Sequence, residues 1–177
     1  MADEGRIFPI YLVEPDPSWP RLYASEAEVL RNEFGTDVIV RIHHYGSTAI
    51  PGIVAKPVID ILVEITDFEI ARREMIPALE KLGYGYNWYV DHMAFFKGYY
   101  PVEQPLKYHL HAAPAGHRLM DGLLFRDYLL SHSEEARRYE ELKRHLAEKH
   151  RHDREAYTDA KGDFIRETLE KARMERA

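Results

Sequence analysis

The stretch of sequence with the most potential chemistry runs from residue 46 to residue 63. Gly46 and Ser47 lie in a predicted turn, where glycine lets backbone N–H groups approach an anion and serine adds a hydroxyl donor. Lys56 in the same loop supplies a positive charge, and Asp60 follows among β-branched neighbours, where a carboxylate needs a partner. This order of residue types predicts a phosphate site beside an acid. The alternative is that Asp60 is a structural acid paired with Lys56 or Arg126.

His109 and His111 form a second group with suitable chemistry. A single residue separates them in a predicted strand, so both imidazoles are expected on the same face of the sheet. Imidazoles bind metals and carry protons, and His44, just before the Gly46 turn, is a further candidate for a general base. The alternative interpretation is that His109 and His111 only cap a sheet edge with satisfied hydrogen bonds.

Hydrophobic periodicity and turn residues predict the elements that position these side chains. Strands are expected at residues 7–13, 37–44, 58–65 and 108–113, with further strands and a turn within 84–100. Helices are expected at 17–34, 68–82, 121–131, from 133 onward, and around 164–172. Strands mixed with helices, followed by helices alone, predict an α+β protein. Its mixed β-sheet is flanked by helices and its C-terminal third is helical, in a single domain covering residues 1–177.

Individual residues sharpen the expected boundaries. Asp16 and Ser133 are expected to be N-caps, and Gly35 and Gly83 to end their helices. Pro77 is expected to kink or split the helix in which it lies, because proline removes one backbone hydrogen bond.

Composition excludes several classes of protein. The 177 residues are 45% hydrophobic and 31% charged, which argues against disorder. No cysteine is present, so disulfides, thiolate metal sites and a cysteine nucleophile are excluded. A net charge of −6 argues against a nucleic-acid partner, and no long apolar window predicts a membrane span. The acidic N-terminal residues are unlike a signal peptide, so a cytoplasmic location is expected. The sequence sets no oligomeric state.

Motifs distributed over nearly the whole chain indicate a family. They are Asp16-Pro17-Ser18-Trp19, His44-Tyr45-Gly46-Ser47-Thr48-Ala49-Ile50-Pro51-Gly52, Ala55-Lys56-Pro57, Ile59-Asp60, His109-Leu110-His111, Phe125-Arg126-Asp127-Tyr128-Leu129, Tyr139, Leu142-Lys143, Tyr157 and Lys161. With these motifs the chain resembles the largely uncharacterised GrpB-like family. The resemblance implies a nucleotidyltransferase-like fold, in which a mixed sheet carries a Gly-Ser turn followed by acidic residues. Some members are fused to dephospho-coenzyme A kinase, which implies work related to nucleotides.

The acidic pattern departs from that of active nucleotidyltransferases. Those enzymes place two carboxylates two residues apart on one strand, where both bind a pair of magnesium ions. Here Asp60 fills the first position but Leu62 the second, and Leu62 cannot bind a metal. If the strand of His109 and His111 replaces the one that brings the third acid, these imidazoles and Asp60 converge on one metal ion. Two imidazoles and one carboxylate favour zinc, manganese or iron over magnesium.

Residues of the C-terminal helices complete the expected anion site. Arg126 is a candidate bidentate clamp for phosphate, with Asp127 orienting it, and the alternative is a salt bridge to the sheet. The resemblance adds Lys143, Tyr157 and Lys161 as phosphate- or nucleotide-binding residues, against the alternative that the lysines are only solvated.

Three hypotheses for function follow. The first is a divergent nucleotidyltransferase-like enzyme that acts on a nucleotide or another phosphorylated small molecule with the help of a metal. In it Gly46 and Ser47 hold phosphate, and His44 or Asp60 deprotonates the acceptor. The second is a non-catalytic nucleotide- or coenzyme-binding regulatory module, which Leu62 favours. The third is a structural or protein–protein domain without a phosphate ligand.

Overall fold

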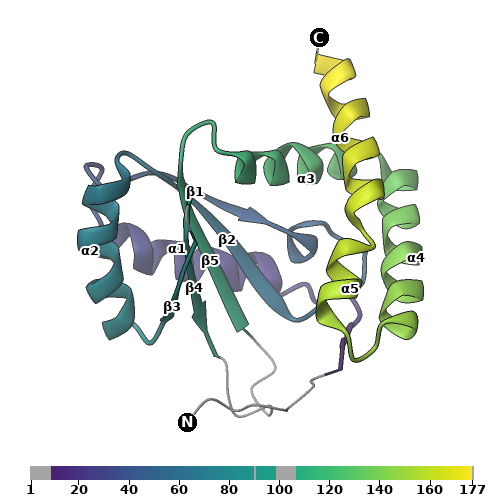
Figure 1. Cartoon of the computed structure of the whole chain (residues 1–177), viewed down its shortest axis with the longest axis horizontal. Helices are drawn as coiled ribbons and strands as arrows, with labels where there is room; N and C mark the ends of the chain where they lie inside the picture. Colours follow the sequence, from purple (N-terminus) through teal and green to yellow (C-terminus); the bar gives the residue numbers. More distant parts are fainter. Residues whose placement is uncertain (1–8, 90, 99–106, 177) are drawn as a thin grey trace.

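The computed structural model describes residues 9–89, 91–98 and 107–176, and Figure 1 shows a sheet flanked by helices. The helices are α1 (Trp19–Glu33), α2 (Phe68–Lys81), α3 (Asp121–Ser131), α4 (Ser133–Lys149), α5 (Arg154–Asp159) and α6 (Gly162–Arg176). The strands are β1 (Ile39–Tyr45), β2 (Val58–Ile65), β3 (Gly85–Trp88), β4 (Met93–Lys97) and β5 (Lys107–Pro114), and the 3₁₀ turns are η1 (Ser47–Ala49) and η2 (Arg118–Met120). The mixed α+β class with a helical C-terminal part is confirmed.

The described strands form a five-stranded sheet in the order β1-β2-β5-β4-β3. β2 and β5 are parallel, whereas the other neighbours are antiparallel. Asp60 of β2 is in register with His109 of β5 on one side and with Tyr45 of β1 on the other. Residues paired in register point to the same face of a sheet, so these three side chains share one face.

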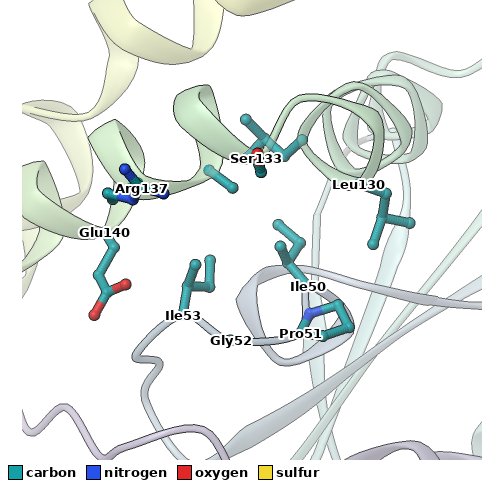
Figure 2. A pocket seen from close by; sticks show the side chains of 10 residues that line it. Ile50, Pro51, Gly52, Ile53, Leu130, Ser133, Arg137 and Glu140 are labelled. Carbon is teal, nitrogen blue, oxygen red and sulfur yellow. The ribbon is translucent and has the colours of Figure 1, made fainter.

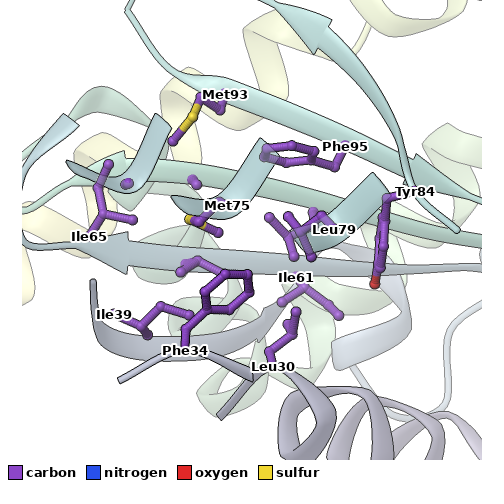
Figure 3. Close-up of a cluster of buried hydrophobic side chains, with 14 of the residues drawn as sticks. Leu30, Phe34, Ile39, Ile61, Ile65, Met75, Leu79, Tyr84, Met93 and Phe95 are labelled. Atoms are coloured by element: carbon purple, nitrogen blue, oxygen red, sulfur yellow. The ribbon is translucent and has the colours of Figure 1, made fainter. Parts of the chain in front are cut away.

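The opposite face of the sheet holds the main hydrophobic core (Figure 3). The sequence of β2 explains this, because alternate residues of a strand point the same way and Ile59, Ile61, Val63 and Ile65 are all buried there. Leu30 of α1 and Met75 and Leu79 of α2 pack against them. Asp60 therefore lies on the face that α1 and α2 leave free.

The C-terminal helices α3, α4 and α6 pack around the loop between β1 and β2. Ile50 and Ile53 of that loop are buried in a second cluster with Tyr128, Tyr139 and Ala172. Figure 1 shows α4, α5 and α6 gathered on the side of the molecule away from α2. The Gly46 turn is thereby held between the sheet and the helical part.

The strand expected at residues 7–13 is wrong over residues 9–13. Those residues are irregular apart from one bridge between Val13 and Ala55, and residues 7 and 8 lie outside the described residues. The backbone N–H of Ile10 donates to the carbonyl of Arg151 instead of to a strand. Apolar residues of this segment, such as Ile10, pack beside the C-terminal helices. Their apolar pattern therefore resembles that of a strand, although the segment does not pair as one.

Smaller differences concern helix ends. Helix α1 begins at Trp19, and Asp16 accepts a hydrogen bond from the N–H of Ser18 before the helix starts. Ser133 is the first residue of α4 and not its N-cap. Helix α2 continues through Pro77 without being split. The strands expected within 84–100 are β3 and β4, while residues 90, 99 and 100 lie outside the described residues. No described helix has the length and apolarity to span a membrane.

Candidate functional site

The Gly46 turn and Asp60 are in direct contact. Gly46 has a φ of +70°, and a Cβ added to it would lie 2.3 Å from Oδ2 of Asp60. Only glycine therefore permits both the turn and the close approach of the carboxylate. The next residue, Ser47, is hydrogen-bonded through its side chain to Tyr139 of α4, whose pKa burial raises to about 12. The turn, the carboxylate and α4 thus form one unit.

This contact predicts a large difference between two glycine-to-alanine variants. Gly46→Ala should lower the free energy of unfolding by about 1–3 kcal/mol more than Gly52→Ala, as measured by urea denaturation. Gly52 is a matched control because its φ is +79° but no heavy atom lies within 4 Å of an added Cβ. Equal losses would mean that the Asp60 side chain moves away without cost.

Two lysines from distant parts of the chain meet at the ring of Tyr157. The Nζ atoms of Lys56 and Lys161 lie 5.2 Å and 4.3 Å from the ring centroid. Burial, followed by repulsion from Lys56, lowers the pKa of Lys161 to about 8, while Asp60 acts in the opposite sense. Burial, followed by repulsion from Arg154, also lowers the pKa of Lys56. The lysines are thus desolvated, mutually repelling cations near one carboxylate.

Lys143 lies deeper than the other lysines, with 1% of its surface exposed. Its Nζ donates to the backbone carbonyl of Val54 and lies 4.8 Å from the centroid of the Tyr139 ring. Burial, followed by repulsion from Lys161, lowers the pKa of Lys143 to about 7. The expected phosphate ligand is therefore buried, and its ammonium attaches the loop between β1 and β2 to α4.

Asp60, His109 and His111 share a face of the sheet, as their spacing predicts. Nδ1 of His109 lies 3.6 Å from Oδ1 of Asp60. Nδ1 of His111 is buried without a hydrogen-bond partner, and burial lowers the pKa of this imidazole to about 4, against an opposing effect of Asp60. His111 is in register with Leu62, and its ring centroid lies 5.5 Å from that of His92.

The three residues expected to bind a metal do not all come within reach of one ion. In the described part of the chain, they do not form a group whose ligand atoms all lie within 4.8 Å of one another. Asp60 is opposite His109, whereas His111 is two pairs further along the strands, opposite Leu62. The pair of Asp60 and His109 remains close enough to share an ion.

A different group, Asp91, His92 and His117, does bring its ligand atoms within 4.8 Å. Its hydrogen bonds, however, do not suit a metal. Nδ1 of His117 accepts a hydrogen bond from the backbone N–H of Leu119, so a neutral ring carries its proton on Nε2, the atom 3.2 Å from Asp91. A protonated nitrogen cannot bind a metal, and Arg118 already donates to the same carboxylate. The polar atoms of this group therefore have hydrogen-bond partners within the protein.

His44 points to the face opposite to the carboxylate. It is in register with the buried Ile61 and stacks on Tyr23 of α1, with ring centroids 4.7 Å apart. Its Nε2 lies 3.1 Å from the hydroxyl of Thr48, which itself donates to the carbonyl of Val58. Burial lowers the pKa of His44 to about 4. The structure therefore does not bring this candidate base to Asp60. The imidazole instead contacts Thr48, which follows the Gly46 turn, on the opposite face of the sheet.

Arg126 forms hydrogen bonds within the protein. Its Nη1 donates to the backbone carbonyl of His44 at 2.6 Å, and its Nε and Nη2 donate to Asp127 at 2.9 Å and 2.6 Å. The guanidinium thus joins α3 to the end of β1 and pairs with its own neighbour. These hydrogen bonds match the alternative of a structural role, and the predicted phosphate clamp stays a prediction.

Sequence reasoning missed Tyr139 as a site residue, because its helical spacing was typical of a core position. The signal was its place four residues before Lys143, which puts both side chains on the same face of α4. A hydroxyl at that position completes the hydrogen bonding of Ser47.

A separate pocket of about 340 Å³ lies on the other side of the loop (Figure 2). Its walls come from the loop and from α3 and α4, and its lining residues are Ile50, Pro51, Gly52, Ile53, Leu129, Leu130, Ser133, Ala136, Arg137 and Glu140. None of them belongs to the cluster around Asp60, so this mostly apolar pocket is distinct from the candidate site.

Comparisons with known proteins agree with this architecture. The GrpB protein family matches residues 9–171. The UPF0157 protein PA4798 of Pseudomonas aeruginosa is 38% identical over 174 residues, covering 97% of this chain and 69% of that protein. The crystal structure of GrpB from Enterococcus faecalis superposes with a TM-score of 0.80 at 27% identity, covering 92% and 96% of the two chains. A dephospho-CoA kinase of Mycolicibacterium paratuberculosis is 28% identical, covering 93% of this chain and 46% of that protein.

Proposed function

This chain belongs to the GrpB family, and from that premise we propose that the cluster around Asp60 binds a nucleotide or another phosphorylated small molecule and transfers a nucleotidyl group. The observation that carries the proposal is the meeting of Lys56 and Lys161 at the ring of Tyr157. Two partly desolvated ammonium groups repel each other, and a bound phosphate offsets this repulsion with charge-assisted hydrogen bonds.

The turn beside the lysines suits the same ligand. Gly46 lets the turn form with the Asp60 carboxylate packed against it, and Ser47 places a backbone N–H and a hydroxyl next to that carboxylate. Lys143 contributes indirectly, because its bond to Val54 holds the loop that carries Lys56. We therefore assign phosphate binding to the turn and to Lys56 and Lys161, and loop positioning to Lys143.

Asp60 is the group that suits the chemical step. An acceptor hydroxyl that attacks phosphorus must lose its proton, and Asp60 lies beside the turn to receive it. The new oxygen–phosphorus bond forms while the bond to the leaving pyrophosphate breaks, and the ammonium groups stabilise the negative charge that develops. A zinc, manganese or iron ion held by Asp60 and His109 would add Lewis-acid stabilisation when bound.

The binding part of the proposal is tested by isothermal titration with ATP, coenzyme A and inorganic phosphate. We expect saturable binding in the panel, and Lys56→Gln and Lys161→Gln should each weaken it about 10- to 100-fold, since a hydrogen bond to a charged group contributes about 1.5–3 kcal/mol. Lys149→Gln is the matched control, because Lys149 is exposed on α4 and should bind as the wild type does. No binding, or binding that ignores both site variants, contradicts the proposal.

A second candidate function, a non-catalytic nucleotide- or coenzyme-binding module, is favoured by Leu62. This fully buried side chain takes the place where a second carboxylate would bind metal. A relative named dephospho-CoA kinase matches this chain over 46% of its own length, which supports a role linked to nucleotides or coenzymes in either case. Turnover separates the two functions.

A further inference from the structure

We propose that the cluster recognises a diphosphate group and that this binding needs no divalent metal ion, an inference that rests on the proposed phosphate site. The ion considered for Asp60 and His109 belongs to the transfer step and not to this binding. The first support is geometric. Lys56 and Lys161 approach one and the same ring, so the distance between their Nζ atoms is at most the sum of 5.2 Å and 4.3 Å. Ammonium groups held within this limit can both contact one short polyanion.

The second support is the balance of charge around the lysines. Lys161 has both Lys56 and Lys143 as neighbouring cations, and Lys56 in turn has Arg154. Asp60 is the carboxylate whose charge favours the protonated form of both Lys56 and Lys161. With Glu140 beside Lys143, these cations still outnumber the two carboxylates, and a diphosphate carries more of the balancing negative charge than one phosphate does.

The third support is the scarcity of metal ligands on this face. A magnesium ion that bridges phosphates is usually bound by one or two carboxylates as well as by the phosphates. After Asp60, the same face of β2 continues with the apolar Leu62 and then Glu64, whose carboxylate lies 3.9 Å from Nε2 of His43. Asp60 thus has no second carboxylate beside it on the strand, so the ammonium groups are left to balance the diphosphate.

The test is a pair of titrations, with inorganic phosphate and with pyrophosphate, in EDTA at a fixed salt concentration. We expect pyrophosphate to bind at least about 10-fold more tightly than phosphate. Lys56→Gln and Lys161→Gln should each bring this ratio close to one, while Lys149→Gln keeps it. Thermal denaturation of each variant shows whether the protein is folded, and charge at the site is the only property that these substitutions are meant to change.

The outcomes separate this inference from the proposed function. If phosphate binds as tightly as pyrophosphate, the diphosphate inference is wrong and the phosphate site stands. If pyrophosphate gains affinity only when manganese or magnesium replaces EDTA, a metal bridges the ligand and the inference is also wrong. If neither anion binds, the phosphate site itself is wrong.

Discussion

Replacing Asp60 with asparagine is expected to lower the rate of nucleotidyl transfer by about 10²–10⁴-fold, the usual contribution of a general base. The amide has nearly the same shape as the carboxylate, so it still fits against Gly46, but it cannot accept a proton at neutral pH. The measurement is release of pyrophosphate from a panel of nucleoside triphosphates with magnesium, manganese or zinc present. Affinity for the nucleotide should change much less than the rate.

A second acid on the same strand provides the control for that experiment. Glu64 lies on the same face of β2 as Asp60 but beyond Leu62, close to His43. Glu64→Gln makes the same chemical change at a position away from the turn and should leave the rate near that of the wild type. A wild-type protein that binds nucleotide without releasing product would support the binding module. An Asp60→Asn variant with the wild-type rate would assign proton transfer to another group.

Local sequence patterns were sufficient for the central parts of the fold. The strand predicted from Val58 to Ile65 and the helix predicted from Asp121 to Ser131 have the observed bounds of β2 and α3. β2 lies between β1 and β5 and most of its residues are buried, so its sequence is a nearly continuous apolar run. The apolar run that ends at Val13 failed because its residues pair with a loop and the C-terminal helices, and a local pattern does not reveal such partners.

The site was predictable where neighbouring strands decide it. Gly46, Ser47 and Asp60 lie at the end of one strand and the start of the next. Parity placed His109 and His111 on one face, and the family resemblance suggested that Asp60 shares it. Parity does not, however, show which residues of neighbouring strands lie opposite each other. His109 is opposite Asp60, and His111, two residues further on, is therefore opposite Leu62.

Local sequence patterns could not predict which atoms the side chains of the C-terminal helices contact. Arg126 reaches a carbonyl 82 positions away, and Lys143 reaches one 89 positions away. A sequence shows that such side chains carry donors, but only the packing of α3 and α4 on the loop decides which acceptors they meet. For the same reason the sequence could not tell that His44 points to the face covered by α1.

The buried ammonium of Lys143 predicts a dependence of stability on pH that a methionine at this position removes. Its pKa is about 7 in the fold and 10.5 in a free lysine, so the unfolded chain binds more protons between these two values. The free energy of unfolding of the wild type should therefore rise relative to Lys143→Met as the pH rises from about 7 to about 10. The gain should reach as much as about 4 kcal/mol, since one pKa unit corresponds to 1.36 kcal/mol.

The comparison must use the difference between two proteins, because other groups also titrate in that range. Urea denaturation at several pH values gives the free energy of unfolding of the wild type, Lys143→Met and the control Lys149→Met, which removes an exposed lysine from the same helix. The wild type and the control should show parallel profiles, whereas Lys143→Met should diverge from both. Three parallel profiles would show that the ammonium stays protonated throughout and that its bond to Val54 balances the cost of burial. Because that bond positions the loop carrying Lys56, loss of phosphate affinity in Lys143→Met at neutral pH would connect the buried lysine to the site.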